Sequence, residues 1–290
     1  MSAMIPVLDI GGTHATAACV DREQWHVVGE HHRVDVDSHA SADDILAAFA
    51  SAGAELDAAD GAIWGVAMPD PFDYARGIGR FHGVAKFESL DGVDVRGALL
   101  ARLPGRPHEL VFCNDADAFT VGEWVSGAAA GSTRVVGLTL GTGVGSGWVD
   151  GGHVVDPGTP HGGRAHLLHV DGVPLEEAMS RRAIRRAYAA ATGEADADVR
   201  EIADRARAGE QAASSTLARA LHSLGRALAP ALRDFGAEVI VVGGSMSRSW
   251  ELFEPWFREG AGDIPVATIR VAADPDGAPL VGAGYVAAGR

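Results

Sequence analysis

The chain has 290 residues, of which 47% are hydrophobic, and a formal net charge of −15. This length and apolar content can bury one large core or two ordinary ones, and two domains is the better expectation. The acidic balance repels nucleic acids and membrane surfaces, so neither is expected as a partner. The arginine-rich stretch 181–186 is the only local exception, and its spacing is typical of a solvated helix face.

The two cysteines, Cys19 and Cys113, lie in apolar strand-like segments where a small hydrophobic side chain is expected. One pair of cysteines cannot build a disulfide framework or a thiolate zinc site, so no zinc is expected. No window approaches 18 uninterrupted apolar residues, and no basic segment precedes an apolar stretch at the N-terminus. We therefore expect a cytoplasmic protein.

The first half of the chain predicts a strand–turn–strand opening followed by alternating helices and strands. Residues 5–10 and 15–20 have strand patterns, and the turn 11–13 joins them. The elements expected next are a β segment at 25–36, a helix at 42–52, a strand at 62–67, a helix at 95–101, a strand at 110–113 and a helix at 116–129.

The second half repeats this layout. A strand at 135–140 leads into a glycine-rich turn at 141–147 and a return strand at 148–149. The elements expected next are helices at 175–191, 198–208 and 210–235, a strand at 239–242, a helix from 250, a strand at 267–271 and a small-residue helix at the end. Within 210–235, leucines at helical spacing mark one buried stripe: Leu217, Leu221, Leu224, Leu228 and Leu232.

Two α/β halves, each opened by a glycine turn between strands, predict two domains. We expect the first to comprise residues 1–114 together with about 277–290, and the second to comprise 115–276. The hinge is expected near 114–116.

The turn after the first strand has the composition of a phosphate site. A phosphate chain needs closely approaching backbone N–H groups, and a carboxylate nearby holds the hydrated magnesium ion. Asp9 with Gly11, Gly12 and Thr13 supplies this combination, although an ordinary hairpin with a capping aspartate explains it equally well in isolation. A dinucleotide-binding turn is a poorer interpretation, because the spacing is not GxGxxG and the turn leads into a strand.

Two further glycine elements favour the phosphate interpretation. The turn containing Gly141, Thr142 and Gly143 also lies between two strands, with room for a phosphate against its backbone. Gly243 and Gly244 end a strand and begin a helix, so that backbone can approach a flat ligand such as adenine.

Phosphoryl transfer to an alcohol also needs a carboxylate that accepts the hydroxyl proton. Asp115 follows a buried strand directly and lies beside Asn114, at a strand end where function usually lies in α/β sheets. Asp117 is the competitor. Its place inside the following helix suggests instead a first-turn carboxylate that the helix dipole favours.

Five ordered motifs together resemble the ROK family of sugar kinases, within the actin and Hsp70 superfamily. LDIGGT is similar to the family's first phosphate motif, MPDPFD to its sugar loop, CNDADAFTVGE to its NDAxAxxxGE segment, LTLGTGVGSG to its second phosphate motif and VIVVGGSMS to its adenosine motif. The resemblance covers nearly the whole chain. It implies two actin-like, ribonuclease H-like α/β domains with the active site in the cleft between them, a magnesium- and ATP-dependent reaction, and a homodimer.

The resemblance also implies residue roles. Asp115 would be the catalytic base, Asn114 would bind sugar hydroxyls, and Asp9 would hold Mg²⁺ through water. ATP would be bound by the glycine elements: Gly11, Gly12, Thr13, Gly141, Thr142, Gly143, Gly243 and Gly244.

The sugar-binding segments depart from the family pattern. Family kinases carry a GEIGH-like segment followed by a cysteine zinc loop, whereas here the segment is GGRAH and the cysteines are absent. His166 is kept, Gly163 stands for the glutamate, and Glu176 resembles the later sugar ligand. The loop 76–88 lacks the family's Asn-Leu pair and offers Lys86, Glu88 and His82 in its place, which are equally well interpreted as surface charges.

A replacement metal site built from His161, His166 and His169, with Asp156 or Asp171, is a weaker interpretation, because loop histidines without cysteines more often form hydrogen bonds. The leading hypothesis is an ATP-dependent kinase that phosphorylates a glucose-like hexose, at its 6-hydroxyl. The alternatives are a non-catalytic sugar or nucleotide sensor, a kinase of an amino sugar or other polyol, and polyphosphate as the donor. A DNA-binding repressor is not expected, because only eight residues precede Asp9.

Overall fold

The computed structural model describes residues 4–156, 163–264 and 268–289 and divides into two compact units. The first unit comprises residues 1–127 and 274–290, and the second comprises 128–273. The observed boundary therefore follows the helix α3 (Asp115–Val125), where the sequence placed it before that helix. The physical reason is that α3 packs tightly against the C-terminal helix α9 (Gly277–Ala288), which keeps α3 in the first unit.

The first unit contains a five-stranded sheet in the order β3-β2-β1-β4-β7. Its first three strands form an antiparallel meander, and β4 and β7 run parallel to β1. The strands are β1 (Met4–Ile10), β2 (His14–Asp21), β3 (Val27–Asp35), β4 (Ile63–Met68) and β7 (Glu109–Asn114). A small hairpin pairs β5 (Phe72–Asp73) with β6 (Ile78–Gly79).

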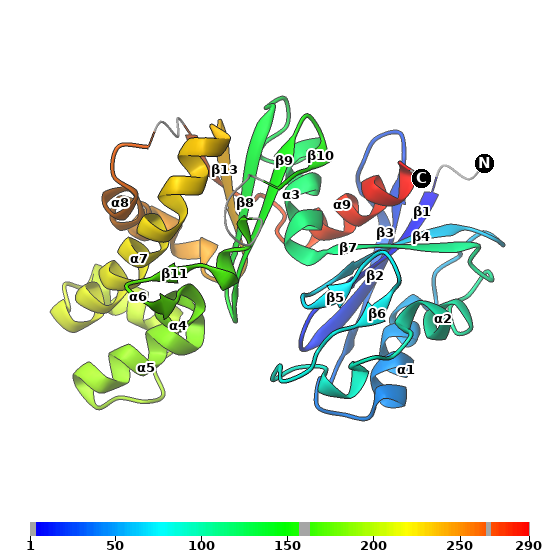
Figure 1. Ribbon diagram of the computed structural model, residues 1–290, viewed down its shortest axis with the longest axis horizontal. Coiled ribbons are helices and arrows are strands. Elements are labelled where there is room, and N and C mark those ends of the chain that lie inside the picture. The colour runs from blue at the N-terminus through cyan, green and yellow to red at the C-terminus, as the bar shows by residue number, and fades with distance from the viewer. Residues whose placement is uncertain (1–3, 157–162, 265–267, 290) are drawn as a thin grey trace. The chain divides into compact units, whose positions relative to one another are not determined.

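Helices cover both faces of this sheet, which explains why β1, β2, β4 and β7 are buried on both sides, whereas the edge strand β3 is largely exposed. Leu8 and Ile10 of β1 pack in one core with α1 (Ala42–Gly53) and α2 (Val95–Leu100). Their neighbour Val7 points to the other face, into a core with α3 and α9. Figure 1 shows α9 on one side of this sheet and α1 and α2 on the other.

The second unit contains a five-stranded sheet in the order β10-β9-β8-β13-β14. The hairpin of β8 and β9 is antiparallel, whereas β13 and β14 are parallel to β8. The strands are β8 (Arg134–Leu140), β9 (Val144–Asp150), β10 (His153–Val154), β13 (Val239–Gly243) and β14 (Thr268–Val271). A two-stranded hairpin of β11 (His169–Val170) and β12 (Val173–Pro174) precedes the helices.

The helices of the second unit gather around α7, as the yellow and green ribbons of Figure 1 show. They are α4 (Leu175–Met179), α5 (Arg181–Thr192), α6 (Val199–Arg207), α7 (Gln211–Phe235) and α8 (Trp250–Ala261). The predicted leucine stripe of α7 is confirmed, because all five leucines are buried in one core.

The single helix predicted at 175–191 is interrupted. Ser180 has an extended backbone, with ψ of 159°, and its hydroxyl accepts a hydrogen bond from the Ala183 N–H at 3.3 Å. Ser180 therefore ends α4 and caps α5, as serine often does at helix starts. In the described residues, none of the helices has the length and apolar character needed to cross a bilayer.

Candidate active site

The carboxyl ends of three parallel strands of the first unit carry polar residues. Asp9 of β1 lies opposite Ala67 of β4, and Met68 of β4 lies opposite Asn114 of β7. Because the strands are parallel and in register, Asp9 and Asn114 reach the same edge of the sheet. Ligands of α/β sheets bind outside this edge.

Asn114 is buried and organises this edge through four hydrogen bonds. Its Oδ1 accepts from the backbone N–H groups of Ala116 and Asp117, at 3.0 and 3.2 Å, and so caps α3. Its Nδ2 donates to Asp70 Oδ2 and Tyr74 Oη, both at 3.1 Å. These four bonds use the full hydrogen-bonding capacity of the amide, so they fix its orientation.

Tyr74 closes this small network. Its hydroxyl lies 2.8 Å from Asp70 Oδ1 and 3.1 Å from the Met68 carbonyl, either of which can accept its proton. Burial, followed by the charge of Asp70, raises the pKa of the Tyr74 hydroxyl, so it stays protonated and serves as a donor.

The two candidate bases lie in the first turn of α3 but differ in exposure. Asp115 is the first residue of the helix and is partly exposed, with Oδ1 2.8 Å from the Ala116 N–H. Asp117 is buried, with 6% of its surface exposed. The arrangement offers Asp115, rather than Asp117, to a ligand at the strand ends.

Asp9 has a strongly perturbed acidity. Burial raises its pKa to about 7, and the neighbouring carboxylates of Asp115 and Asp276 add to this, while Arg33 opposes it. The interaction shows that Asp9, Asp115 and Asp276 share one electrostatic environment. A carboxylate whose pKa is raised this far by burial and neighbouring charges is common at functional sites.

The turn after Asp9 is held by backbone hydrogen bonds. The Gly11 N–H donates to the His14 carbonyl at 2.8 Å, and the Val36 N–H donates to the Thr13 carbonyl at 2.9 Å. The Thr13 hydroxyl is exposed and shares a 3.1 Å hydrogen bond with His14 Nδ1. Gly12 has only a lysine stem near the position of a Cβ, so its backbone is open to a ligand.

The predicted glycine elements of the second unit adjoin each other. The Met246 N–H donates to the Leu140 carbonyl at 3.1 Å, which places the turn after β13 against the end of β8. Gly244 has φ of +80°, and a Cβ there would lie 2.4 Å from the Leu140 carbonyl oxygen. Only glycine fits this close approach. The turns that contain Gly141 and Gly243 therefore form one backbone surface.

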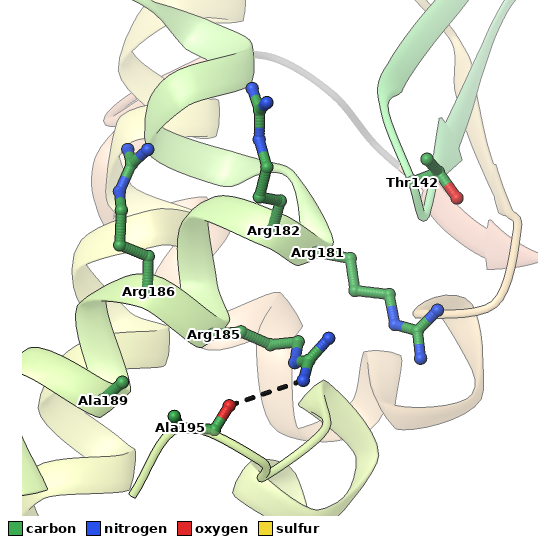
Figure 2. Close-up of a pocket in the computed structure, with 7 residues that line it drawn as sticks. All are labelled: Thr142, Arg181, Arg182, Arg185, Arg186, Ala189 and Ala195. Carbon is green, nitrogen blue, oxygen red and sulfur yellow. Dashed lines mark hydrogen bonds between the residues drawn. The ribbon is translucent and has the colours of Figure 1, made fainter. Parts of the chain in front are cut away.

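A pocket of about 410 Å³ opens beside this surface. Thr142 lines it together with four arginines of α5: Arg181, Arg182, Arg185 and Arg186. Figure 2 shows Arg181 and Arg185 extending to one side of the helix and Arg182 and Arg186 to the other.

The arginines of this pocket are held by different partners. Arg181 pairs with Asp198 at 2.7 Å, and the Arg181 N–H donates to the Gly141 carbonyl at 2.9 Å. Arg182 and Arg186 both pair with Glu177. Arg185 donates to the Ala195 and Ala197 carbonyls. The helix face predicted to be merely solvated therefore lines a cationic pocket.

The segment expected to bind sugar is anchored to β9. The Gly163 carbonyl accepts hydrogen bonds from Ser146 Oγ at 2.6 Å and Trp148 Nε1 at 3.0 Å. Gly163 has φ of +70°, a conformation that a glutamate adopts only with strain. His166 lies in the short 3-10 helix Ala165–Leu167 that follows. The glycine at this position therefore adopts its backbone conformation without strain.

Glu176 lies beside the second phosphate turn. A Cβ on Gly143 would be 2.7 Å from Glu176 Oε1, so the carboxylate covers that glycine directly. The described residues include no group of three or more histidine, cysteine or acidic side chains placed to hold a metal ion. His161, one member of the weaker metal hypothesis, lies outside the described residues.

Sequence reasoning did not assign roles to Asp70, Tyr74, Arg33 or Asp276. Asp70 and Tyr74 are in or beside the MPDPFD motif, but only the structure shows that they bind Asn114. Asp276 precedes the last helix, and its charge raises the pKa of Asp9 although the two residues are 267 positions apart in the chain. The sequence signal that could have indicated Asp276 is the DPDG segment before a helix, because acidic residues favour helix N-termini.

Known proteins are similar to this chain over most of its length. Residues 6–290 match the ROK family. The chain is 32% identical over 254 residues to the glucokinase of Thermotoga maritima, which covers 77% of this chain and 78% of that protein.

Solved structures of similar proteins cover almost the whole chain. A ROK family glucokinase from Streptomyces griseus, in complex with glucose and AMPPNP, matches with a TM-score of 0.77 and 25% identity, covering 99% of this chain and 100% of the other. The inorganic polyphosphate/ATP-glucomannokinase of Arthrobacter sp. strain KM matches with a TM-score of 0.70 and 29% identity, covering 99% of both chains. The expected actin-like α/β fold of two domains is thereby confirmed. The chain belongs to the ROK family and is a sugar kinase, an enzyme that transfers a phosphoryl group to an alcohol.

Proposed function

We propose that this protein is an ATP-dependent hexose kinase that phosphorylates a glucose-like sugar at its 6-hydroxyl. The observation that carries the proposal is the place of Asp115, a partly exposed carboxylate at the start of α3 whose charge raises the pKa of Asp9. Transfer to an alcohol requires such a carboxylate beside a phosphate-binding turn. The glucose and AMPPNP bound to the Streptomyces griseus relative support the choice of substrates.

In the proposed reaction, Asp115 accepts the proton of the attacking hydroxyl and aligns its oxygen. Asn114 fixes the start of α3, and a sugar hydroxyl would exchange for one of the acceptors of its Nδ2. His166 and Glu176 supply the further sugar contacts in this proposal. The water that would compete as acceptor has to be excluded when the substrates bind.

The carboxylates of the first unit fit a hydrated magnesium ion. Burial and the charges of Asp115 and Asp276 make ionised Asp9 unfavourable, and a divalent cation would relieve this repulsion. Asp9 would hold the ion, which neutralises phosphate charge when bound.

The cationic pocket of the second unit fits the nucleotide. It lies beside Thr142, next to the turn expected to receive the phosphates. Guanidinium planes such as those of Arg181 and Arg185 can stack on a purine or donate to ribose and phosphate oxygens. The same cations suit an inorganic polyphosphate chain, and the Arthrobacter relative uses that donor as well as ATP by its name.

Coupled ADP release over a panel of hexoses, N-acetylhexosamines and inositols tests the proposal. We expect turnover with glucose-like hexoses, and a loss of about 10³-fold in kcat for Asp115→Asn, because a positioned base contributes roughly 10²–10⁴-fold. Asp117→Asn is the matched control, since it removes a carboxylate from the same helical turn and should leave kcat within a few-fold. A parallel assay with polyphosphate in place of ATP, in which the sugar phosphate itself is detected, identifies the donor.

Other outcomes of this panel separate the alternatives. Turnover confined to N-acetylhexosamines or inositols would replace the hexose with an amino sugar or polyol. Tight sugar binding without turnover would contradict the proposed reaction and favour the non-catalytic sensor. Activity that survives Asp115→Asn but not Asp117→Asn would transfer the role of base to Asp117.

A further inference from the structure

Lys86 is the only lysine in the chain, and all its other strongly basic side chains are arginines. It lies on the loop between β6 and the short 3-10 helix Glu88–Leu90. A Cβ placed on Gly12 would lie 3.7 Å from Lys86 Cδ, so the lysine stem lies beside the first phosphate turn and leaves its backbone open. The ammonium follows two bonds beyond Cδ.

The backbone beside Lys86 is firmly anchored. Phe87 is fully buried, makes edge-to-face contacts with Phe49 and Phe81, and donates its N–H to the Ser38 carbonyl at 2.9 Å. Ser89 Oγ donates to the Ala40 carbonyl at 2.8 Å. These contacts tie the loop to the segment 36–40.

The same segment holds the phosphate turn, because the Val36 N–H donates to the Thr13 carbonyl at 2.9 Å. Lys86 and Gly12 are therefore positioned by one piece of backbone. Within the described part of the chain, no carboxylate pairs with the Lys86 ammonium and no hydrogen bond occupies it. The charge is available to a ligand.

We propose that Lys86 is a catalytic residue that binds the phosphoryl group during transfer at the turn 11–13. The carboxylates of Asp9, Asp115 and Asp276 repel an incoming triphosphate, and the compact ammonium of a lysine whose stem lies beside the turn offsets this repulsion. As the acceptor oxygen bonds to the γ-phosphorus, the bond to the β–γ bridging oxygen breaks and ADP leaves. The hydroxyl proton passes to Asp115, and Lys86 keeps its own protons throughout.

This inference rests on the proposed ATP-dependent transfer, and kinetics of Lys86 variants test it. We expect Lys86→Met to lower kcat about 100-fold, because the transition state loses one preorganised charged donor. The KM for the sugar should stay within about threefold of the parent value. Lys86→Arg keeps the charge and should recover part of the rate. His82→Ala is the matched control from the same loop and should retain the parent kcat, since its ring is 92% exposed. A raised sugar KM with unchanged kcat for Lys86→Met would overturn the proposal.

The single lysine permits a second test on the unaltered enzyme. Acetylation by an N-hydroxysuccinimide ester modifies one side-chain amine, which peptide mass spectrometry follows separately from the N-terminal amine. We expect magnesium AMPPNP, or inorganic tripolyphosphate, to slow acetylation of Lys86 at least fivefold, whereas glucose alone should not. Protection by glucose alone, or by none of these ligands, would overturn the proposal. If the parent enzyme turns over no sugar, the proposed function fails, while tripolyphosphate protection still reports whether Lys86 binds phosphate.

Discussion

At the scale of single residues, the first unit concentrates carboxylates where a phosphate is expected to bind. Asp9 feels both Asp115 and Asp276, and Asp70 is held by Asn114 and Tyr74. Without ligands this arrangement costs stability, because ionised carboxylates repel one another and are poorly solvated. Such a cost is expected at sites shaped for function.

The raised pKa of Asp9 makes a prediction about stability and pH. Below about pH 4, Asp9 is protonated in both the folded and unfolded states. As pH rises to about 7, the unfolded chain releases this proton while the folded chain retains it, so the free energy of unfolding falls. We expect Asp9→Asn to exceed the parent stability by roughly 2 kcal/mol at pH 8 and by much less at pH 4.5. Chemical denaturation in EDTA at both pH values measures this, and parallel pH profiles for the two proteins would contradict it.

A second prediction concerns the hydroxyl of Tyr74. Tyr74→Phe removes a donor to Asp70 and an acceptor for Asn114, so we expect a loss of about 1 kcal/mol in unfolding free energy. The sugar KM should rise several-fold, because Asn114 and Asp70 lose their fixed orientation. Tyr285→Phe is the control, since Tyr285 makes ring contacts with Trp25 and Trp124 and its hydroxyl has no hydrogen bond among the described residues. If both variants had the same stability and the same sugar KM, the hydrogen bonds of Tyr74 would have no role in sugar binding.

At the scale of elements, the crossing of α3 and α9 sets the geometry of the candidate site. Asn114 and Asp115 lie at the start of α3, and Asp276 directly precedes α9. The helices approach so closely that a Cβ on Gly122 would lie 1.9 Å from the Ala278 carbonyl oxygen. Gly282 has the reciprocal relation to the Ala118 carbonyl, at 1.8 Å. Glycine on both helices therefore permits the contact.

Alanine at either crossing glycine should separate the two helices. We expect Gly122→Ala or Gly282→Ala to lower the unfolding free energy by about 3 kcal/mol or more, because backbone atoms must shift. Gly289→Ala at the end of α9 should be nearly neutral, since a Cβ there meets only the Val286 carbonyl at 3.6 Å. Thermal and urea denaturation compare the three variants. A small effect at Gly122 would show that the helices can move apart without loss.

At the scale of the whole molecule, two units with separate sheets and cores each present glycine turns at strand ends. The overall charge of −15 is unfavourable for binding polyanions, yet each unit contains cationic side chains beside a phosphate turn. The cations are thus local exceptions within an acidic chain.

The charge distribution predicts that the protein does not bind duplex DNA. Non-specific binding proteins typically have dissociation constants of roughly 10⁻⁴–10⁻⁶ M at physiological salt and bind more tightly at low salt. We expect no mobility shift at about 10 μM protein in 50 mM salt. A shifted band lost in a variant with alanine at Arg181, Arg182, Arg185 and Arg186 would contradict this and assign DNA binding to α5.

The sequence alone predicted most elements and the order of the motifs, because strand and helix periodicities and glycine turns are local properties. The sequence predicted one continuous helix at 175–191 and missed the break between α4 and α5. The whole run has helical composition, and the capping role of Ser180 depends on its backbone conformation. The sequence also divided the chain before α3. That helix belongs to the first unit because of its contact with α9, which is distant in sequence.

Strand and helix periodicities predicted two α/β halves, and the resemblance of five motifs predicted the ROK family and the residue types of the candidate site. Only the tertiary structure decided which residues lie near one another: Asp276 near Asp9, Tyr74 and Asp70 beside Asn114, and Lys86 beside Gly12. The reason is physical. Backbone preferences act over a few residues, whereas electrostatic coupling and side-chain hydrogen bonds depend on distances that only the packed sheets and helices establish.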